Sequence, residues 1–165
     1  MEKTVIDEVP SEPNLRDIHE IRRPVSDALG TENVAMNFFE LTPGELFSPG
    51  LHAHHDQEEI FYVVAGRAEF TVGRERETVT VEEGEMIRFA PGEFQTGYVP
   101  ESADEHVAAL AIGAPGTRHS WGEDLVSLVY CRECEAEHPH ESRPADDRTG
   151  FELTCTVCKN EFVVR

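Results

Sequence analysis

The feature that most constrains the fold is a series of short apolar segments between residues 34 and 116, each closed by Gly or Pro. These segments are rich in Val, Phe, Ile and Thr, which favour strands, and their even spacing predicts an antiparallel sandwich or barrel. We expect strands within 34–41, 42–50, 60–66, 68–73, 77–84, 86–92 and 106–116. Residues 68–81 alternate on both sides of Gly73, which predicts a hairpin.

The flanking segments differ from this central part. Residues 1–24 are polar, contain three prolines and show no sustained period, so they predict an N-terminal arm. Residues 25–116 form the predicted barrel, and a Gly- and Pro-bearing stretch then leads into residues 117–165, a linker with a small module. At 165 residues, one domain with a small appendage fits the chain. The predicted fold class is all-β, a small antiparallel β-barrel plus a small C-terminal β module.

The stretch "GLHAHHDQEEIFYVVAGRAEF" begins with three histidines and three acids. Alternate residues of a strand face the same side, so His52 and His54 would project together. Glu59 reaches that side if the chain bends before it and returns on the next strand. Two His and one carboxylate on one side of a metal leave coordination positions open, which suits iron-dependent oxygen chemistry. The alternative is a solvated charged loop with chance histidines.

Within this stretch, "PGLHAHHDQEEIFYVVAG" resembles the first motif of the cupin superfamily. Matching positions are Gly50, His52, His54, Glu59 and Gly66. "GEMIRFAPGEFQ" is similar to the second motif through Gly84, Glu85, Pro91 and Gly92, but Gln95 stands where the family usually has its last His ligand. The resemblance covers roughly residues 25–115. It implies a jelly-roll barrel with a metal near its axis, but it does not identify a substrate.

Gln95 has three interpretations at this point. It is a fourth metal ligand, a hydrogen-bonding group for substrate beside a three-ligand site, or the mark of a barrel that has lost tight metal binding. The predicted barrel metal is Fe, Mn or another divalent ion. The interior is otherwise expected to be an apolar cavity lined by Phe61, Val63, Phe70, Phe89 and either Met36 or Phe38.

The second candidate centre is formed by Cys131, Cys134, Cys155 and Cys158. Two C-x-x-C pairs separated by 20 residues have the spacing of a tetrahedral four-thiolate zinc site. Rubredoxin-like iron in the same cage, disulfides and free thiols are the alternatives, and an intracellular setting disfavours disulfides. A closed site of this kind stabilises a small zinc-ribbon-like module and is structural rather than catalytic.

Two further histidines, His138 and His140, lie in the polar insertion between the two cysteine pairs. We predict a solvated loop for them rather than a role as spare ligands. A single cupin followed by a four-Cys site also resembles the bacterial 3-hydroxyanthranilate 3,4-dioxygenase family. This chain departs from that family's motif, which has one His before the "EE" pair and a His after the second-motif proline.

The charge of the chain argues against nucleic acid as a partner. Thirty-three acids against 14 bases give a net charge of −19, and residues 117–165 carry ten acids and six bases. Adaptation to high salt is one explanation, because the Debye length is only about 3 Å at 1 M ionic strength; a merely acidic protein is the other. The longest apolar runs are too short to cross a bilayer and the first residues lack a signal-peptide core, so we expect a soluble, cytoplasmic protein.

These observations predict a metal-binding cupin that acts on or binds a small molecule, most concretely as an Fe- or Mn-dependent dioxygenase-like oxidoreductase. The alternative is a non-catalytic ligand- or metal-sensing module whose ribbon docks a partner. The sequence leaves open whether the chain is an enzyme and assigns no catalytic residue. Edge-to-edge pairing of two barrels into a homodimer is an expectation that the resemblance carries.

Overall fold

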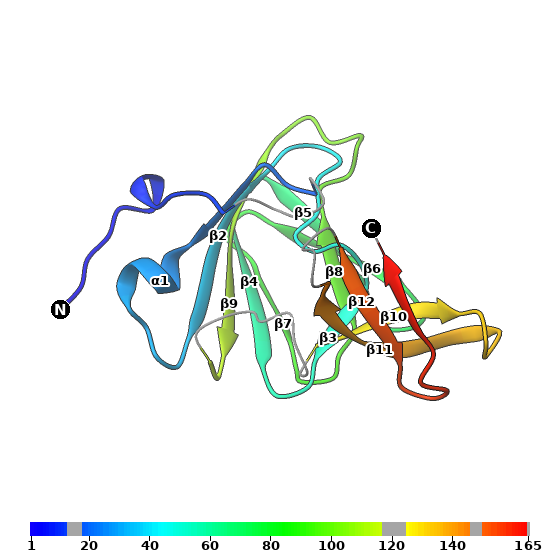
Figure 1. Ribbon diagram of the computed structural model, residues 1–165. Helices are drawn as coiled ribbons and strands as arrows, with labels where there is room; N and C mark the ends of the chain where they lie inside the picture. Colours follow the sequence, from blue (N-terminus) through cyan, green and yellow to red (C-terminus); the bar gives the residue numbers. More distant parts are fainter. Residues whose placement is uncertain (13–17, 117–124, 146–149, 165) are drawn as a thin grey trace.

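The chain folds almost entirely into strands. The computed structural model describes residues 1–12, 18–116, 125–145 and 150–164 (Figure 1). Two short helical segments are present, η1 (Ile6–Glu8) and α1 (Val25–Leu29). The strands are β1 (Ile21–Pro24), β2 (Ala35–Leu41), β3 (His52–His54), β4 (Glu58–Ala65), β5 (Arg67–Val72), β6 (Glu77–Glu82), β7 (Met86–Phe89), β8 (Gln95–Tyr98), β9 (Val107–Ala114), β10 (Leu125–Cys131), β11 (Ala136–Pro144), β12 (Phe151–Cys155) and β13 (Glu161–Val164). Most of the predicted linker, residues 117–124, lies outside the described residues.

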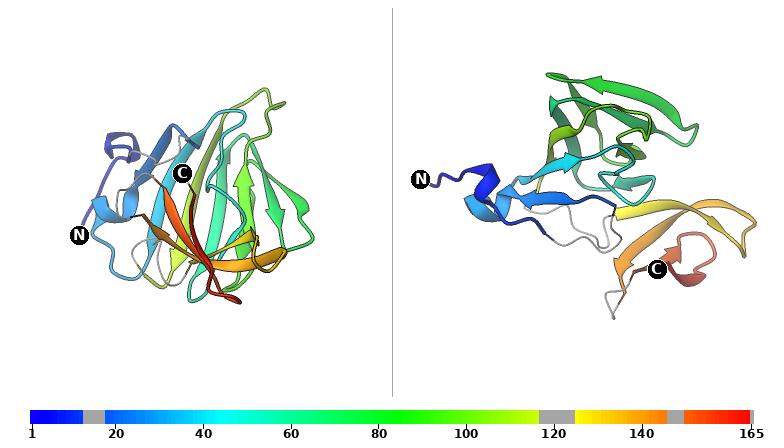
Figure 2. Two further views of the ribbon diagram at one scale, coloured as in Figure 1. Left: turned by 45° about the vertical axis from the view of Figure 1, so that its right-hand side comes forward. Right: turned by 90° about the horizontal axis from the view of Figure 1, so that it is seen from above.

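The strands form two antiparallel sheets that enclose the core. One sheet has the order β1-β2-β9-β4-β7, and the other has the order β13-β12-β11-β10-β3-β8-β5-β6. The views in Figure 2 show the barrel, which is formed by the smaller sheet and strands β3, β8, β5 and β6 of the larger one. The remaining strands of the larger sheet, β10 to β13, lie beside the barrel. The predicted all-β jelly-roll barrel is confirmed, and so is the hairpin, in which β5 pairs with β6.

Three segments differ from the prediction. Residues 42–50 were expected to be a strand but form a loop, because Pro43 and Pro49 cannot donate ladder hydrogen bonds. One isolated bridge joins this loop to β8, between Leu46 and Tyr98. The short, polar strand β8 had no clear signal in the sequence. The last residues of the predicted arm form β1, which pairs with β2 at the edge of a sheet.

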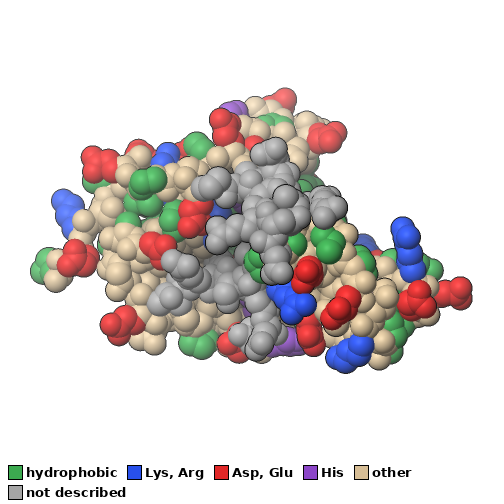
Figure 3. Space-filling view, viewed as in Figure 1, with side chains coloured by type: hydrophobic (Ala, Val, Ile, Leu, Met, Phe, Trp, Pro, Cys, Tyr) green, Lys and Arg blue, Asp and Glu red, His purple; other side chains and the backbone are tan. Residues whose placement is uncertain are grey.

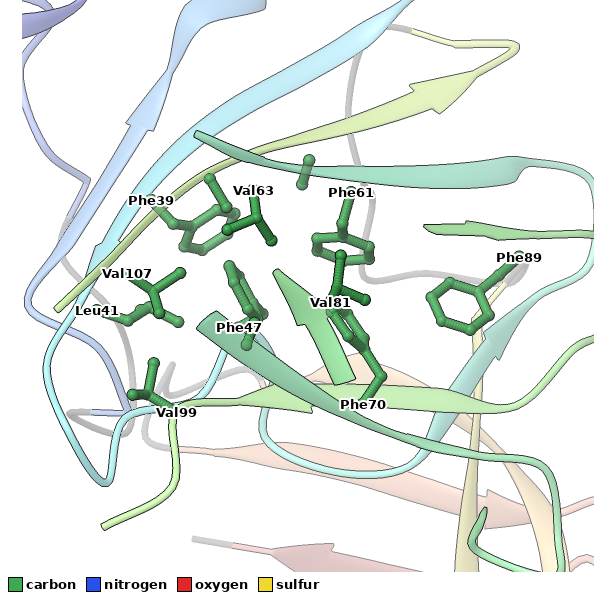
Figure 4. Close-up of a cluster of buried hydrophobic side chains, with 13 residues drawn as sticks. Phe39, Leu41, Phe47, Phe61, Val63, Phe70, Val81, Phe89, Val99 and Val107 are labelled. Carbon is green, nitrogen blue, oxygen red and sulfur yellow. The ribbon is translucent and has the colours of Figure 1, made fainter. Parts of the chain in front are cut away.

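The barrel interior is packed with aromatic rings (Figure 4). Phe61, Val63, Phe70 and Phe89 are inward and buried as expected, but they pack as core. Phe47, from the loop, lies among them, and neighbouring ring centroids in this cluster are 4.9 to 6.3 Å apart. Phe38 is buried but does not belong to this cluster, and neither does Met36; the residues that β2 contributes to it are Phe39 and Leu41.

The cysteine-bearing strands continue a barrel sheet. Strand β10 pairs with β3 through three residue pairs, Leu125 with His54, Val126 with Ala53 and Ser127 with His52. A second link joins the β5–β6 turn to β11, where Arg76 Nη1 and Nη2 donate to the Glu137 carboxylate at 3.1 and 2.7 Å. The C-terminal part is therefore tied to the strand that carries both barrel histidines.

The visible surface carries many acidic and few basic side chains (Figure 3). Among the residues that the structure describes, no helix has the length and apolar character needed to span a membrane.

Candidate metal centres

The predicted barrel ligands meet inside the barrel. His52 and His54 stand at the two ends of β3, and Glu59 comes from β4 in the opposite sheet. His55 and Asp56 are exposed at the bend between these strands. Gln95 begins β8 and lies directly opposite His52 in the ladder. The exposed fractions of His52, His54, Glu59 and Gln95 are 5%, 7%, 5% and 2%.

The distances within this cluster suit a shared ion. The potential ligand atoms of His52, His54 and Glu59 all lie within 4.8 Å of one another. The Glu59 Oε2 atom is 3.8 Å from His54 Nε2 and 4.0 Å from His52 Nε2. Ligand atoms at about 2.0 to 2.2 Å from one metal are roughly 3 to 3.5 Å apart, so a small contraction would complete the site.

Both histidines are held in the neutral form that binds metals. Burial lowers the pKa of His52 to about 4, assisted by the neighbouring His54, and burial also lowers the pKa of His54 to about 4. His52 Nδ1 lies 3.0 Å from the Gly50 carbonyl oxygen and 3.2 Å from Ser48 Oγ. With the Nδ1 proton donated to Gly50, His52 Nε2 carries a lone pair, which is the form of the ring that can ligate a metal.

Glu59 lacks enough local positive charge to ionise readily. Burial raises its pKa to about 8, although the hydrogen bond from Gln95 and the charge of Arg22 act in the opposite direction. At neutral pH the carboxyl group is therefore mostly protonated unless a cation lies beside it, and its contacts with the neutral histidines are not ion pairs. A divalent ion would supply that charge, so this donor set fits a metal.

Gln95 completes the cluster from β8. Its Nε2 group donates to Glu59 Oε2 at 2.6 Å and lies 3.2 Å from His52 Nε2. Its Oε1 atom is buried and has no hydrogen-bond partner. A half-turn of the amide exchanges Nε2 and Oε1, so that Oε1 would point between Glu59 and His52. Gln95 thus has the geometry of a fourth ligand in one orientation and of a hydrogen-bond donor in the other.

The four cysteines also meet, at the turns after β10 and β12. Their sulfur atoms lie within 4.8 Å of one another, with Cys131 and Cys158 at 3.5 Å, and all four are free thiols. A tetrahedral zinc site with Zn–S bonds of about 2.3 Å places sulfurs about 3.8 Å apart. The residue after each pair, Glu135 or Lys159, has a left-handed φ of 54° or 62°. The two turns therefore share one knuckle geometry.

One cysteine shows the electrostatics expected of a thiolate ligand. Burial acts to raise the pKa of Cys155, but hydrogen bonds from the backbone N–H groups of Cys158 and Val157, together with those of the Cys158 and Cys131 side chains, lower the pKa to about 7. Amide groups that point at a sulfur stabilise its deprotonated form, which is the form that binds metals.

The solvated-loop prediction was wrong for His140. Residues 136–144 form β11, paired with β10 on one side and β12 on the other, and His140 is 0% exposed. Its Nδ1 lies 2.8 Å from the His138 carbonyl oxygen, and its ring packs edge-on against Phe162 at 5.4 Å. Neither histidine belongs to the two groups of side chains that, among the described residues, could hold a metal.

A row of residues across the larger sheet connects the two centres. The sequence did not predict this row. Successive partners in the antiparallel ladders are Gln95, His52, Ser127, His140 and Cys155. Directly opposed residues in such ladders place their side chains on the same face. His52 on β3 is thus separated from Cys155 on β12 by the two intervening strands β10 and β11.

Comparison with known proteins agrees with this architecture. The Cupin domain family matches residues 37–104. Vicilin Cor a 11.0101 of Corylus avellana is 40% identical over 65 residues, which cover 38% of this chain. The match spans only 14% of the length of that vicilin.

Solved structures extend the likeness to the fold. The polyketide cyclase RemF from Streptomyces resistomycificus has a TM-score of 0.62 at 17% identity, covering 82% of this chain and 90% of that one. A sugar phosphate isomerase of the cupin superfamily from Silicibacter pomeroyi has a TM-score of 0.58 at 17% identity, covering 99% and 92%. Residues 37–104 thus match the Cupin domain family, and the jelly-roll strand order and these structures show a cupin-like fold for the chain.

Proposed function

We propose that the barrel binds iron or manganese through His52, His54 and Glu59 and acts on a small molecule as a dioxygenase-like oxidoreductase. The observation that carries this proposal is the buried cluster of two neutral imidazoles and one carboxyl group whose raised pKa calls for a cation. Three protein ligands on one side of such an ion leave positions for exogenous ligands, and the ion would supply the site for oxygen chemistry.

The surrounding residues would prepare this site for that role. The Gly50 carbonyl fixes the tautomer of His52, and Gln95 holds the Glu59 carboxyl group in place. Across the ladders, Glu59 has Gly113 on one side and Phe89 on the other. An apolar ring and a residue without a side chain thus flank Glu59, and neither side chain offers its carboxyl group a polar partner.

The structural neighbours support an enzyme without selecting a reaction. The two reported above are a polyketide cyclase and a sugar phosphate isomerase, which perform different chemistry on the same fold. The dioxygenase proposal therefore rests on the ligand set of this chain and not on the neighbours.

For the cysteine site we propose structural zinc, with iron as the alternative metal. Four free thiols at this spacing persist in a reducing compartment, so we place the protein in the cytoplasm. The metal would stabilise the knuckles and, through them, the strands β10 to β13.

A non-catalytic sensor is the second candidate. Gln95 already satisfies Glu59 and His52 through its amide protons, so the cluster is hydrogen-bonded without a metal. Tyr130 and Val157, next to cysteines of the two pairs, are 55% and 62% exposed and would form part of a partner surface.

Metal analysis tests the barrel site. The wild-type protein and His55→Ala should each hold a barrel metal in addition to the cysteine-site metal after reconstitution with Fe²⁺ or Mn²⁺, while His54→Ala should lose only the barrel metal. His55 is the matched control, because it is adjacent in sequence and exposed. A wild-type protein that takes up no barrel metal would refute the proposal.

Oxygen uptake separates the enzyme from the sensor. The iron-loaded protein would be tested with catechols, aminophenols, diketones and thiols. Uptake with one of these classes that is lost in His54→Ala supports the enzyme. Tight binding of an intact metabolite without uptake supports the sensor.

A further inference from the structure

A cleft lies between the loop Pro49–Leu51 and the C-terminal strands. Its volume is about 180 Å³, and most of its wall is apolar, with Phe151 and Leu153 from β12 and Val164 from β13. Among the described residues that line it, three have polar side chains, namely His52, Ser127 and Ser142, and none is charged. This combination is typical of a site for an uncharged organic molecule.

The polar groups of this cleft belong to the row that crosses the sheet. Ser127 is the ladder partner of His52 on one side and of His140 on the other. Ser142 is almost fully buried, and its hydroxyl donates to Ser127 Oγ at 2.9 Å. Ser142 Oγ also lies 3.4 Å from the His140 carbonyl oxygen, so the bond to Ser127 is the shorter of its two. With the Ser142 proton on that bond, the Ser127 hydroxyl has its own proton for an acceptor within the cleft.

We propose that this cleft binds a small, uncharged molecule with one six-membered ring and one hydroxyl or carbonyl oxygen. An apolar cavity of about 150 Å³ is large enough for benzene. This cleft, at about 180 Å³, therefore has room for one ring and not for two. A carboxylate or phosphate would be buried without a cationic partner, which is costly. The oxygen of the ligand accepts from Ser127, and the ring contacts Leu153 and Val164.

This site is separate from the proposed metal site, although the two share His52. The cleft is also lined by Gly50, whose carbonyl oxygen holds His52 Nδ1. A bound molecule would therefore lie on the side of His52 that faces away from Glu59. Binding does not require a barrel metal, so this inference and the proposed function fail independently.

Three probes of similar size test the chemistry, each titrated into the 165-residue chain and followed by the amide NMR signals of Ser127 and Leu153. Phenol should bind, benzene should bind about fivefold more weakly because it lacks one hydrogen bond, and benzoate should bind at least about tenfold more weakly than phenol. In Ser127→Ala the phenol affinity should fall to that of benzene, with benzene unchanged. Equal binding of phenol and benzoate, or no binding of phenol, overturns the proposal.

Two substitutions on one strand test the location. Val164→Phe fills the cleft, whereas Val163→Phe adds the same volume to a residue that is 46% exposed and does not line it. Phenol binding should be lost in the first and kept in the second. Wild-type affinity in Val164→Phe, or loss of binding in His54→Ala, would place phenol elsewhere and overturn the proposal. The phenol-to-benzene ratio in Ser127→Ala decides the question even where Val164→Phe does not fold.

Discussion

Gly97 lies against the aromatic rings of the barrel interior, which leave no room for a side chain. A Cβ atom added there would lie 2.5 Å from Phe70 Cε1 and 2.7 Å from Phe47 Cδ2. Carbon atoms in contact are about 3.5 to 4.0 Å apart, so the rings would have to move by roughly 1 Å. Phe47 and Phe70 are stacked at 5.8 Å with their planes 11° apart, and Phe61 contacts both at 5.2 and 4.9 Å. Neither ring can retreat without displacing another.

We therefore predict that Gly97→Ala destabilises the protein. Overpacking a core costs about 1 to 3 kcal/mol, whereas replacing Gly restricts the unfolded chain and returns about 0.4 to 1 kcal/mol. The size of the overlap places the cost in the upper half of its range, so the net loss should be about 1 to 2.5 kcal/mol. Gln95 lies two residues away on the same face of β8, so the hydrogen bond to Glu59 should weaken as well.

Equilibrium unfolding in urea at a fixed metal concentration measures this effect. The midpoint should fall in Gly97→Ala with an unchanged m-value. Gly50→Ala is the control, because its added Cβ meets nothing within 4 Å and its φ is not left-handed; its stability should stay within about 0.5 kcal/mol of wild type. A Gly97→Ala protein as stable as wild type would show that the aromatic cluster can rearrange, and the packing argument would be wrong.

Three further predictions concern the cysteine site, pH and salt. Cys155→Ser should release the C-terminal metal and weaken Mn²⁺ binding in the barrel severalfold, because β10 holds the strand of His52 and His54; unchanged Mn²⁺ affinity would mean that the centres are independent. Burial is the main cause that lowers the pKa of His19 in the folded protein below its value in the unfolded chain, so protonation of this imidazole favours unfolding. Stability should therefore fall as the pH drops below about 6.5, and less so in His19→Gln; identical urea midpoints at pH 7.5 and 5.5 in wild type would refute this. If the net charge of −19 reflects adaptation to salt, the melting temperature should rise from dilute buffer to molar KCl, and a constant value would exclude that hypothesis.

The parts of the site that could be predicted depend on short-range patterns. The pair His52 and His54 follows from the two-residue period of a strand, and the bend that returns Glu59 to the same side follows from the polar residues before it. The cysteine cluster follows from spacing alone, because a C-x-x-C turn already positions two of the four sulfurs.

The parts that were missed depend on contacts between distant residues. Strand β8 is short and polar, and it is ordered by β5 and β3 on its two sides. Strand β11, with its two prolines and the buried His140, has the composition of a loop and is a strand only because β10 and β12 flank it. Phe47 joins the core from a loop, where no periodicity marks it.

Strand β3 has a consequence for the order of events during synthesis. It is only three residues long, with one ladder pair to β8 and three to β10. Its partners in β10 are residues 125–127. These residues leave the ribosome after more than seventy further residues have been added to the chain. Until then the edge of β3 that faces away from β8 has no strand partner. We expect the growing chain to complete its barrel centre only after β10 has been made, so that maturation of the metal site waits for the last quarter of the protein.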